Sequence, residues 1–193
     1  MLKIGITGGI GSGKTTVCKL FETLGIPVYY ADGRAKELMN TDMQLKALLQ
    51  ERFGATIYVD GQLNRNKLAA LIFNNKENLQ TVNGWVHPAV ARDFEKWCHT
   101  QHAQYAMEES AILFEHNLAA LFDKVILVTA PENLRIERVC RRDAVRAEAV
   151  RQRMNNQWSE EKKKRLADFI IHNDDENMLI PQILEIHRQL TTA

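Results

Sequence analysis

Apolar residues along the chain fall into two alternating patterns. Short, largely apolar runs predict strands that are buried on both faces of a sheet, and they lie at residues 2–7, 26–30, 105–108, 124–129 and 169–172. Between these runs, apolar residues recur every three or four positions and predict helices over residues 13–24, 33–52, 64–73, 88–102, 132–142, 144–155 and 178–190. The alternation predicts an α/β fold, with a five-stranded parallel sheet flanked by helices.

The spacing of the predicted strands is uneven. About 74 residues separate the second strand from the third, which is far more than one crossover helix needs. We therefore expect a single domain with a core over about residues 1–32, 104–134 and 166–193. A helical insertion is expected beside this core, over about residues 33–103.

Composition narrows the class of protein. The 25 Lys and Arg residues and 24 Asp and Glu residues leave a net charge of +1, so bulk charge does not favour nucleic acid as a partner. Three cysteines without a CxxC spacing favour a reducing cytoplasm. No apolar run approaches the roughly 18 residues of a membrane span. We expect a cytoplasmic protein, with a monomer favoured among oligomeric states.

The first predicted strand runs directly into a glycine-rich segment that fits the pattern GxxxxGK[ST]. Glycines let successive backbone N–H groups surround a phosphate, and the following helix adds its positive N-terminal end. In such a loop the lysine reaches the β- and γ-phosphates and the next hydroxyl holds Mg²⁺, which predicts these roles for Lys14 and Thr15. The predicted ligands of the ATP phosphates are Gly8, Gly9, Gly11, Ser12, Gly13, Lys14, Thr15 and Thr16.

A GTPase is excluded by the absence of a guanine-reading motif. That motif, [NT]KxD, follows a late strand, whereas the nearest string in this chain is Asn75-Lys76-Glu77-Asn78, inside the insertion. The phosphate loop therefore predicts a kinase or another ATP-binding protein.

Asp32 follows the second predicted strand. Ligands of an open parallel sheet bind beyond the carboxyl ends of its strands, so this carboxylate should face the ligand crevice. It can orient an acceptor hydroxyl for attack on the γ-phosphate, or it can cap the helix that follows. Spacing alone leaves both roles open.

Positive charge gathers in one segment although the total is nearly neutral. Residues 134–165 hold 11 of the 25 basic residues and 5 acidic ones, a net charge of +6. Arg135, Arg138, Arg142 and Arg146 recur at helical spacing and predict one arginine face. In a kinase this segment, over about residues 135–165, would form a helical lid on the triphosphate. The alternative is a solvated face, which we favour for the run 162–165.

Motifs spread over nearly the whole chain resemble those of the dephospho-CoA kinases, a family of phosphate-loop kinases. In order, they are IGITGGIGSGKTTV, LGIPVYYAD, GQLNR with Leu68 and Phe73, His87-Pro88, Ile112-Leu113-Phe114-Glu115, Arg138 with Arg142-Asp143, Arg153-Met154-Asn155-Asn156-Gln157, and Ala167-Asp168 with residues 170–173. Two positions depart from the family pattern. Tyr30 stands where the family usually has an acidic residue, and Ala111 where it usually has proline.

The resemblance implies an enzyme that uses Mg²⁺ and ATP to phosphorylate the ribose 3′-hydroxyl of dephospho-CoA, the last step of coenzyme A synthesis. It implies that Asp32 is the catalytic base or the hydroxyl-orienting carboxylate. It implies catalytic or phosphate-binding roles for Lys14, Arg138 and Arg142, with Arg153 as a further lid residue. The implied acceptor-binding residues are Asp32, Arg65, His87, Leu113 and Glu115, although Glu115 can also be a scaffold residue.

Several alternatives stay open at this point. A nucleoside or nucleoside-monophosphate kinase would share the core and the lid, and a non-catalytic switch would bind ATP without acceptor-dependent turnover. Glu108 and Glu109 both lie near the end of the third strand, where an acidic residue linked to Mg²⁺ is expected, and the sequence does not choose between them. Asn173 follows the last strand and is placed to line an adenine site.

Overall fold

The computed structural model describes residues 1–73 and 75–192 of the chain. The chain folds into two compact units. The first unit is formed by Met1–Tyr30 and Gln101–Ala193, and the second by Ala31–Thr100.

The first unit contains a five-stranded sheet in which every neighbouring pair of strands is parallel, in the order β2–β5–β1–β6–β7. Its strands are β1 (Leu2–Thr7), β2 (Val28–Tyr30), β5 (Tyr105–Glu109), β6 (Lys124–Thr129) and β7 (Phe169–His172). Its α-helices are α1 (Lys14–Thr23), α6 (Glu132–Asp143), α7 (Ala147–Met154), α8 (Glu160–Lys164) and α9 (Leu179–Thr191), and a short 3₁₀ helix lies at Leu118–Leu121. The predicted parallel sheet flanked by helices is confirmed.

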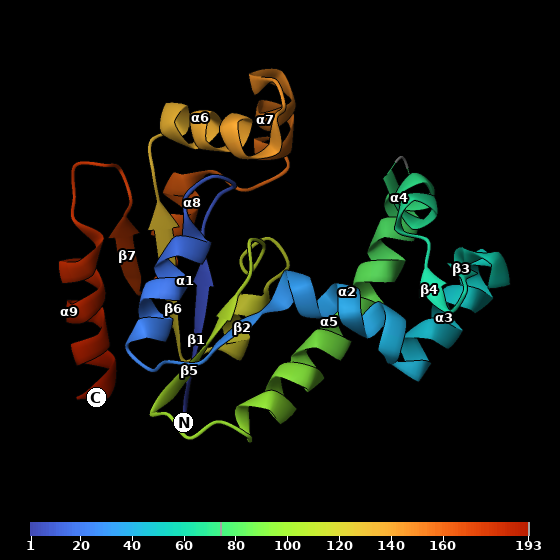
Figure 1. The fold of residues 1–193 in the computed structure, drawn as a ribbon, viewed down its shortest axis with the longest axis horizontal. Helices are drawn as coiled ribbons and strands as arrows, with labels where there is room; N and C mark the ends of the chain where they lie inside the picture. The colour runs from blue at the N-terminus through green and yellow to red at the C-terminus, as the bar shows by residue number, and fades with distance from the viewer. Residues whose placement is uncertain (74, 193) are drawn as a thin grey trace. The chain divides into compact units, whose positions relative to one another are not determined.

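One face of the sheet is covered by α1 and α9, which lie side by side (Figure 1). Ile4 and Ile6 of β1 are fully buried there, in one cluster with Val17 and Phe21 of α1 and Ile183 of α9. Side chains alternate between the two faces of a strand, so β1 presents every second residue to this cluster. Burial of large apolar side chains, at about 1.5–3 kcal/mol each, anchors the helix that follows the phosphate loop.

The opposite face packs against the segment that follows β5. Leu113, Phe114 and Val125 form a buried cluster on this side, together with partly buried residues that include Phe122 and Trp158. Gly5 faces this cluster, and a Cβ atom on it would lie 2.7 Å from Leu113 Cδ1. A side chain at position 5 would therefore displace the packed loop.

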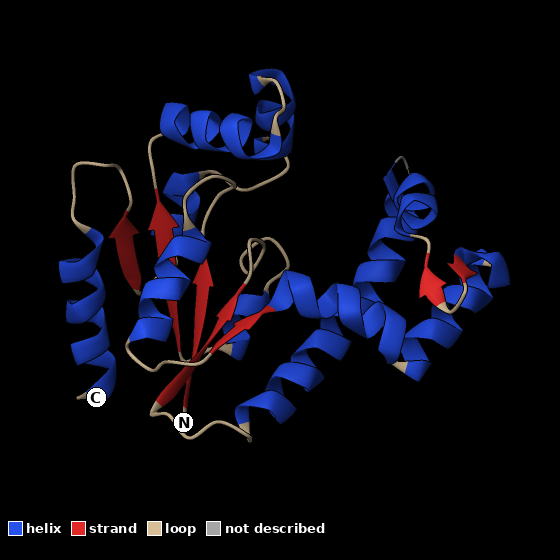
Figure 2. Ribbon diagram, in the orientation of Figure 1, coloured by secondary structure: helices blue, strands red, loops and turns tan. Residues whose placement is uncertain are grey.

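Helices α6 and α7 lie beyond the carboxyl ends of the strands, on the same side as the phosphate loop (Figures 1 and 2). Ligands of open parallel sheets bind at this edge. The connection from β6 to α6 and the loop from β7 to α9 also reach this edge (Figure 1). The architecture therefore gathers several loops, far apart in sequence, around the phosphate loop.

The second unit is helical, with one two-stranded antiparallel ribbon (Figure 2). Its elements are α2 (Ala31–Thr41), α3 (Met43–Phe53), a 3₁₀ helix (Ala55–Ile57), β3 (Tyr58–Val59), β4 (Gln62–Leu63), α4 (Arg65–Phe73) and α5 (Lys76–Cys98). The ribbon was not predicted from sequence because each strand has only two residues, too few for an alternating pattern to be visible.

Two predicted helices differ from the structure by more than a few residues at one end or by an interruption. The helix predicted over residues 33–52 is two helices, because Asp42 adopts an extended conformation and its side chain accepts a hydrogen bond from Leu45 N–H, which caps α3. The helix predicted to begin at Pro88 begins at Lys76, capped by Asn75, and Pro88 lies inside it. Buried apolar residues on both sides of the proline, such as Val82 and Phe94, hold the helix against its own unit.

Among the described residues, no helix combines the length and the apolar character that crossing a membrane requires.

Candidate functional site

The phosphate loop connects β1 to α1 and depends on its glycines. Gly11 and Gly13 have φ angles of 80° and 90°, a region that favours glycine. A Cβ atom on Gly13 would lie 2.0 Å from Asn173 Nδ2, and one on Gly8 would lie 2.3 Å from Val128 O. Backbone conformation requires glycine at positions 11 and 13, and the close approach of neighbouring segments requires it at positions 8 and 13.

Lys14 is the first residue of α1, and its side chain folds back onto the phosphate loop. Its Nζ donates a hydrogen bond to Gly8 O at 3.1 Å and lies 3.8 Å from Glu109 Oε1, at the end of β5. Both charged side chains are about nine-tenths buried. Of the two acidic candidates, Glu109 is thus placed beside the phosphate-loop lysine.

Two groups near this pair, the buried Cys18 and the partly buried Tyr30, are kept neutral. Burial raises the pKa of the Cys18 thiol well above its usual range, and the Glu109 carboxylate adds to the shift. Burial also raises the pKa of the Tyr30 hydroxyl, and Glu22, to which this hydroxyl is hydrogen-bonded, adds to that shift. Tyr30, which replaces the acidic residue usual in the family, thus brings no negative charge to the end of β2.

A pocket of about 480 Å³ lies against the phosphate loop and the first turn of α1. Two arginines of α6, Arg138 and Arg142, form part of its wall, so the structure brings them together with the loop. The complete lining is Gly11, Gly13, Lys14, Thr15, Thr16, Arg138, Val139 and Arg142. A cationic pocket rimmed by backbone N–H groups at a helix N-terminus is suited to a polyphosphate.

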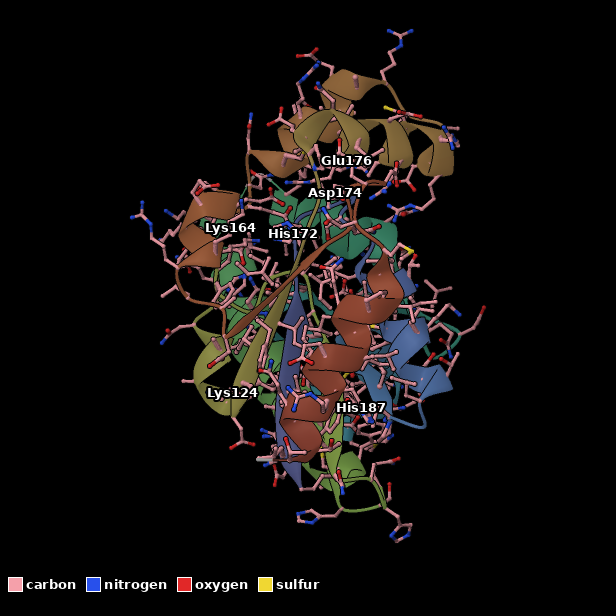
Figure 3. The ribbon with its side chains drawn as sticks, turned by 90° about the vertical axis from the view of Figure 1, so that its left-hand side faces the viewer. Lys124, Lys164, His172, Asp174, Glu176 and His187 are labelled. Atoms are coloured by element: carbon pink, nitrogen blue, oxygen red, sulfur yellow. The ribbon has the colours of Figure 1, made fainter. Side chains whose placement is uncertain are left out.

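Arg138 is held by the loop that follows β7. Its Nη1 donates to Asn173 O at 2.9 Å, and its Nη2 pairs with Asp175 Oδ1 at 2.6 Å. Asn173 also donates from its Nδ2 to Ser12 O at 2.8 Å, and thereby links this loop to the phosphate loop. Figure 3 shows neighbouring residues Asp174 and Glu176 of this loop close to α6. The sequence placed Asn173 near a nucleotide but did not indicate this side-chain bridge.

Arg142 and Arg153 share one carboxylate, that of Asp143. Arg142 donates to it from Nε at 2.7 Å and Arg153 from Nη1 at 3.1 Å, so α7 is tied to the end of α6. The hydrogen bonds from Arg142 hold the pKa of the Asp143 carboxyl below its ordinary value. Asp143 therefore sets the position of two predicted lid arginines, a role that its sequence position did not reveal.

The predicted arginine face over residues 135–146 is wrong in two respects. Helix α6 ends at Asp143 and Ala144 adopts a left-handed conformation with φ of 53°, so Arg146 belongs to the cap of the next helix. Arg135 is buried and does not line the pocket of Arg138 and Arg142. Its Nε donates to Ile10 O at 3.0 Å and its Nη1 pairs with Glu160 at 3.2 Å.

The basic run 162–165 is not uniformly solvated, contrary to our expectation. Lys163 is fully buried, and its Nζ lies 2.6 Å from Glu115 Oε1. The same oxygen accepts a hydrogen bond from Trp158 N–H at 3.0 Å. Lys162 lies over the Trp158 ring, 3.0 Å from its centre. The run of four basic residues does not reveal the burial of Lys163, because only one lysine of helix α8 points inward.

Two residues predicted to bind the acceptor have core positions in the first unit. Leu113 is fully buried in the cluster that faces Gly5. The Glu115 carboxylate pairs with Lys163 and accepts a hydrogen bond from Trp158 N–H. Their side chains shape the loop that follows β5. Neither lines the pocket at the phosphate loop.

The other predicted acceptor residues belong to the second unit. Asp32 is exposed in the first turn of α2, and its carboxylate has no hydrogen-bond or ion-pair partner among the described residues. Because α2 begins at Ala31, Asp32 lies inside the helix and not at the capping position before it. Arg65 is exposed at the start of α4, and His87 is half-buried within α5.

The residues around the phosphate loop fit Mg²⁺ bound together with a nucleotide. Thr15 places a hydroxyl on the pocket wall, and Glu109 adds a carboxylate beside Lys14. No group of three or more His, Cys, Asp or Glu side chains among the described residues could hold a metal ion by itself. Mg²⁺ in phosphoryl-transfer sites takes only one or two protein oxygens and completes its shell with phosphates and waters.

The sheet order, the phosphate loop and the arginine-lined pocket define a class of protein, the phosphate-loop kinases. The crystal structure of TT1252 from Thermus thermophilus matches with a TM-score of 0.82 and 31% identity, over 99% of this chain and 96% of that one. Shikimate kinase from Acinetobacter baumannii shares the fold, with a TM-score of 0.55 and 14% identity over 100% of this chain and 94% of that one.

Within this class, the chain belongs to the dephospho-CoA kinase family, whose model matches residues 2–178. Dephospho-CoA kinase of Bacteroides fragilis is 42% identical over 186 residues, which cover 96% of this chain and 91% of that protein. The resemblance seen in the sequence is thus confirmed. The chain is a phosphotransferase of coenzyme A biosynthesis, and the nucleoside kinase alternative is not favoured.

Proposed function

We propose that the chain transfers the γ-phosphoryl group of ATP to the ribose 3′-hydroxyl of dephospho-CoA. The observation that carries the proposal is the pocket in which the phosphate loop, Arg138 and Arg142 meet. Phosphoryl transfer needs positioning and charge stabilisation more than covalent chemistry, and such a pocket supplies both.

The phosphate loop and Lys14 hold the triphosphate. Gly11, Gly13 and Lys14 line the pocket at the N-terminus of α1, where backbone N–H groups and the lysine ammonium would bind phosphate oxygens. Thr15, with Glu109 nearby, would hold Mg²⁺, which when bound neutralises charge on the β- and γ-phosphates. Gly8, Gly9, Gly11, Ser12, Gly13 and Thr16 complete the proposed phosphate site.

Arg138 and Arg142 stabilise negative charge on the transferring phosphoryl group. Arg138 pairs with Asp175 and Arg142 with Asp143, and in each pair one side chain is more than half exposed, so the pair is weak enough to be exchanged for a phosphate. Arg153, which also pairs with Asp143, serves as the next lid residue. Planar guanidinium groups suit this role because they bind two oxygens at once.

Asp32 orients the acceptor hydroxyl and accepts its proton. Two features support this role over a capping role: its carboxylate has no partner among the described residues, and it lies within α2. Arg65 and His87 remain proposed contacts to the acceptor. We assign Leu113 and Glu115 to the scaffold beneath the loop after β5, because their side chains are buried or already paired.

The direct test is release of ADP from Mg-ATP with dephospho-CoA, compared with adenosine, AMP and a blank without acceptor. We expect turnover with dephospho-CoA alone and a product heavier by one phosphate, located on the 3′-oxygen by fragmentation mass spectrometry. Turnover confined to adenosine or AMP would contradict the proposed acceptor. ATP binding without turnover on any acceptor would favour the non-catalytic switch.

Replacing Asp32 with asparagine tests its role. Asp32→Asn is expected to lower kcat by roughly 10²-fold or more, because the amide cannot accept the hydroxyl proton. The affinity for ATP, measured by calorimetry, should stay within about twofold. The matched control is Asp42→Asn, which changes the cap of α3 in the same unit. A near-normal kcat for Asp32→Asn would remove this residue from the catalytic machinery.

The cytoplasmic location, the monomeric state and the absence of nucleic-acid partners stay predictions from the sequence.

A further inference from the structure

The phosphate loop is held from outside by two residues of the basic segment. Ile10, at the tip of the loop, donates its backbone N–H to Gln157 Oε1 at 2.9 Å. Its backbone carbonyl accepts a hydrogen bond from Arg135 Nε at 3.0 Å. Both polar groups of one backbone position are thus bound by side chains that lie 147 and 125 residues away in the sequence.

Arg135 and Gln157 are themselves anchored. Arg135 is buried and pairs with Glu160 at 3.2 Å, and the guanidinium lies so close to Gly9 that a Cβ there would approach it to 2.4 Å. Gln157 Nε2 donates to Ala111 O at 3.4 Å, in the loop after β5. Gln157 therefore connects the phosphate loop to the end of a neighbouring strand.

The loop needs such support because glycine backbones do not specify their own conformation. Ile10 lies between Gly9 and Gly11, and glycine has the largest conformational freedom to lose on ordering. A phosphate site requires successive N–H groups to be fixed in one direction before the ligand arrives. Bonds to Ile10 from outside restrict the peptide groups on both sides of it.

The distribution of hydrogen bonds separates supporting from ligand-binding amides. The Ile10 N–H is already used by Gln157, whereas those of Gly11 and Gly13 have no acceptor among the described residues. Gly11 and Gly13 also line the pocket shared with Arg138 and Arg142, and Ile10 does not. Ile10 is therefore a point at which the loop is held from outside, in addition to Ser12, whose carbonyl accepts from Asn173 Nδ2.

We propose that Gln157, assisted by Arg135, is a positioning residue for the nucleotide: it fixes the phosphate loop through Ile10. The proposal rests on the proposed use of ATP and adds a residue of the basic segment that touches no substrate in this role. It gives that segment a second task. Its pocket arginines, Arg138 and Arg142, bind phosphate, and its inward side chains hold the loop that binds the same phosphates.

The test is Gln157→Met, which preserves the length of the side chain and removes both hydrogen bonds. We expect Kd and KM for ATP to rise roughly 10-fold, the size expected for loss of one or two such bonds. The KM for dephospho-CoA should stay within about twofold. If Gln157→Met does not fold, Gln157→Asn retains the amide but is one methylene shorter, and the same shift in ATP affinity is expected.

The control is Asp123→Ala. Asp123 Oδ2 accepts a hydrogen bond from Lys3 N–H at 2.7 Å, so it also holds a distant backbone group of the β1 region, at the end away from the phosphate loop. This variant should lose thermal stability without a change in Kd for ATP. Equal Kd values for Gln157→Met and the wild type would overturn the proposal, as would a change confined to the KM for dephospho-CoA.

ATP affinity, measured by calorimetry, does not depend on turnover. If the wild type binds ATP but does not phosphorylate dephospho-CoA, the proposed function fails while the effect of Gln157 on Kd is still measured. If turnover is normal and Kd is unchanged in the variant, the positioning role fails alone.

Discussion

Four positive side chains of residues 134–165 form two groups that differ in burial. Arg142 and Arg153 are 65% and 50% exposed, and both pair with Asp143. Lys163 is 1% exposed and pairs with Glu115, and Arg135 is nearly as buried and pairs with Glu160. The two groups come from one run of charge in the sequence, but they lie in different environments.

This difference separates ligand binding from support. An exposed ion pair contributes about 0–1 kcal/mol, so its arginine can exchange a carboxylate for a phosphate at little cost. A buried charge that loses its partner destabilises the folded state by several kcal/mol, so Lys163 and Arg135 cannot exchange their partners for a ligand. The exposed group can therefore act on a ligand, while the buried group fixes the elements around it.

The largest expected effect is on stability, at Lys163. Lys163→Met would leave the Glu115 carboxylate buried without its cation, and we expect the free energy of unfolding to fall by about 3–5 kcal/mol. Urea denaturation measures this change. Adding Glu115→Leu should recover part of the loss, although Trp158 N–H then lacks its acceptor. A loss below about 1 kcal/mol for the single variant would place this pair with the exposed ones.

The next effect is on catalysis, at Arg142. Arg142→Ala should lower kcat by about 10²- to 10³-fold, or about 2.7–4 kcal/mol, as for removal of one donor to a developing charge. The free energy of unfolding should change by less than about 0.5 kcal/mol, because the side chain is exposed. Arg141→Ala is the matched control, since Arg141 is 78% exposed and pairs with Glu137 outside the pocket. Equal kcat values for the two variants would contradict the assignment.

The smallest effect concerns a surface pair, Lys124 with Asp168. Hydrogen bonds from Lys124 and from Val125 N–H outweigh the effect of partial burial and hold the pKa of the Asp168 carboxyl below its ordinary value of 3.8. Asp168→Asn should therefore cost about 1 kcal/mol at pH 7, where the carboxylate is ionised.

The pH dependence of this cost has a definite sign. Because the folded-state pKa is lowered, the stabilisation is complete above pH 3.8 and is lost as pH falls through the folded value. Unfolding curves for the wild type and Asp168→Asn should therefore converge in strong acid. A difference in stability that stays constant down to pH 2 would show that the charge of Asp168 is not its cause.

Much of the site follows from local patterns in the sequence. The phosphate loop and the bounds of β1, β6 and β7 could be predicted because glycine spacing and buried strands leave contiguous signals. The pocket role of Arg138 and Arg142 was indicated by helical spacing together with the family motifs. These predictions concern residues whose neighbours in sequence are also their neighbours in function.

Other assignments required contacts between distant segments. The burial of Arg135 and Lys163 could not be predicted from a run of charge, since each depends on an acid from a different element. The pairing of Glu109 with Lys14 joins the end of β5 to the phosphate loop, and the hydrogen bond between Ile10 and Gln157 joins residues 147 positions apart.

The sequence by itself determined the fold class, the phosphate loop and the family, because strand periodicity and motif order are properties of short segments. The tertiary structure alone decided which cations face the pocket and which support it. The reason is physical: the energy of a charge depends on its solvent exposure and its partner, and both are set by the packing of elements far apart in the chain.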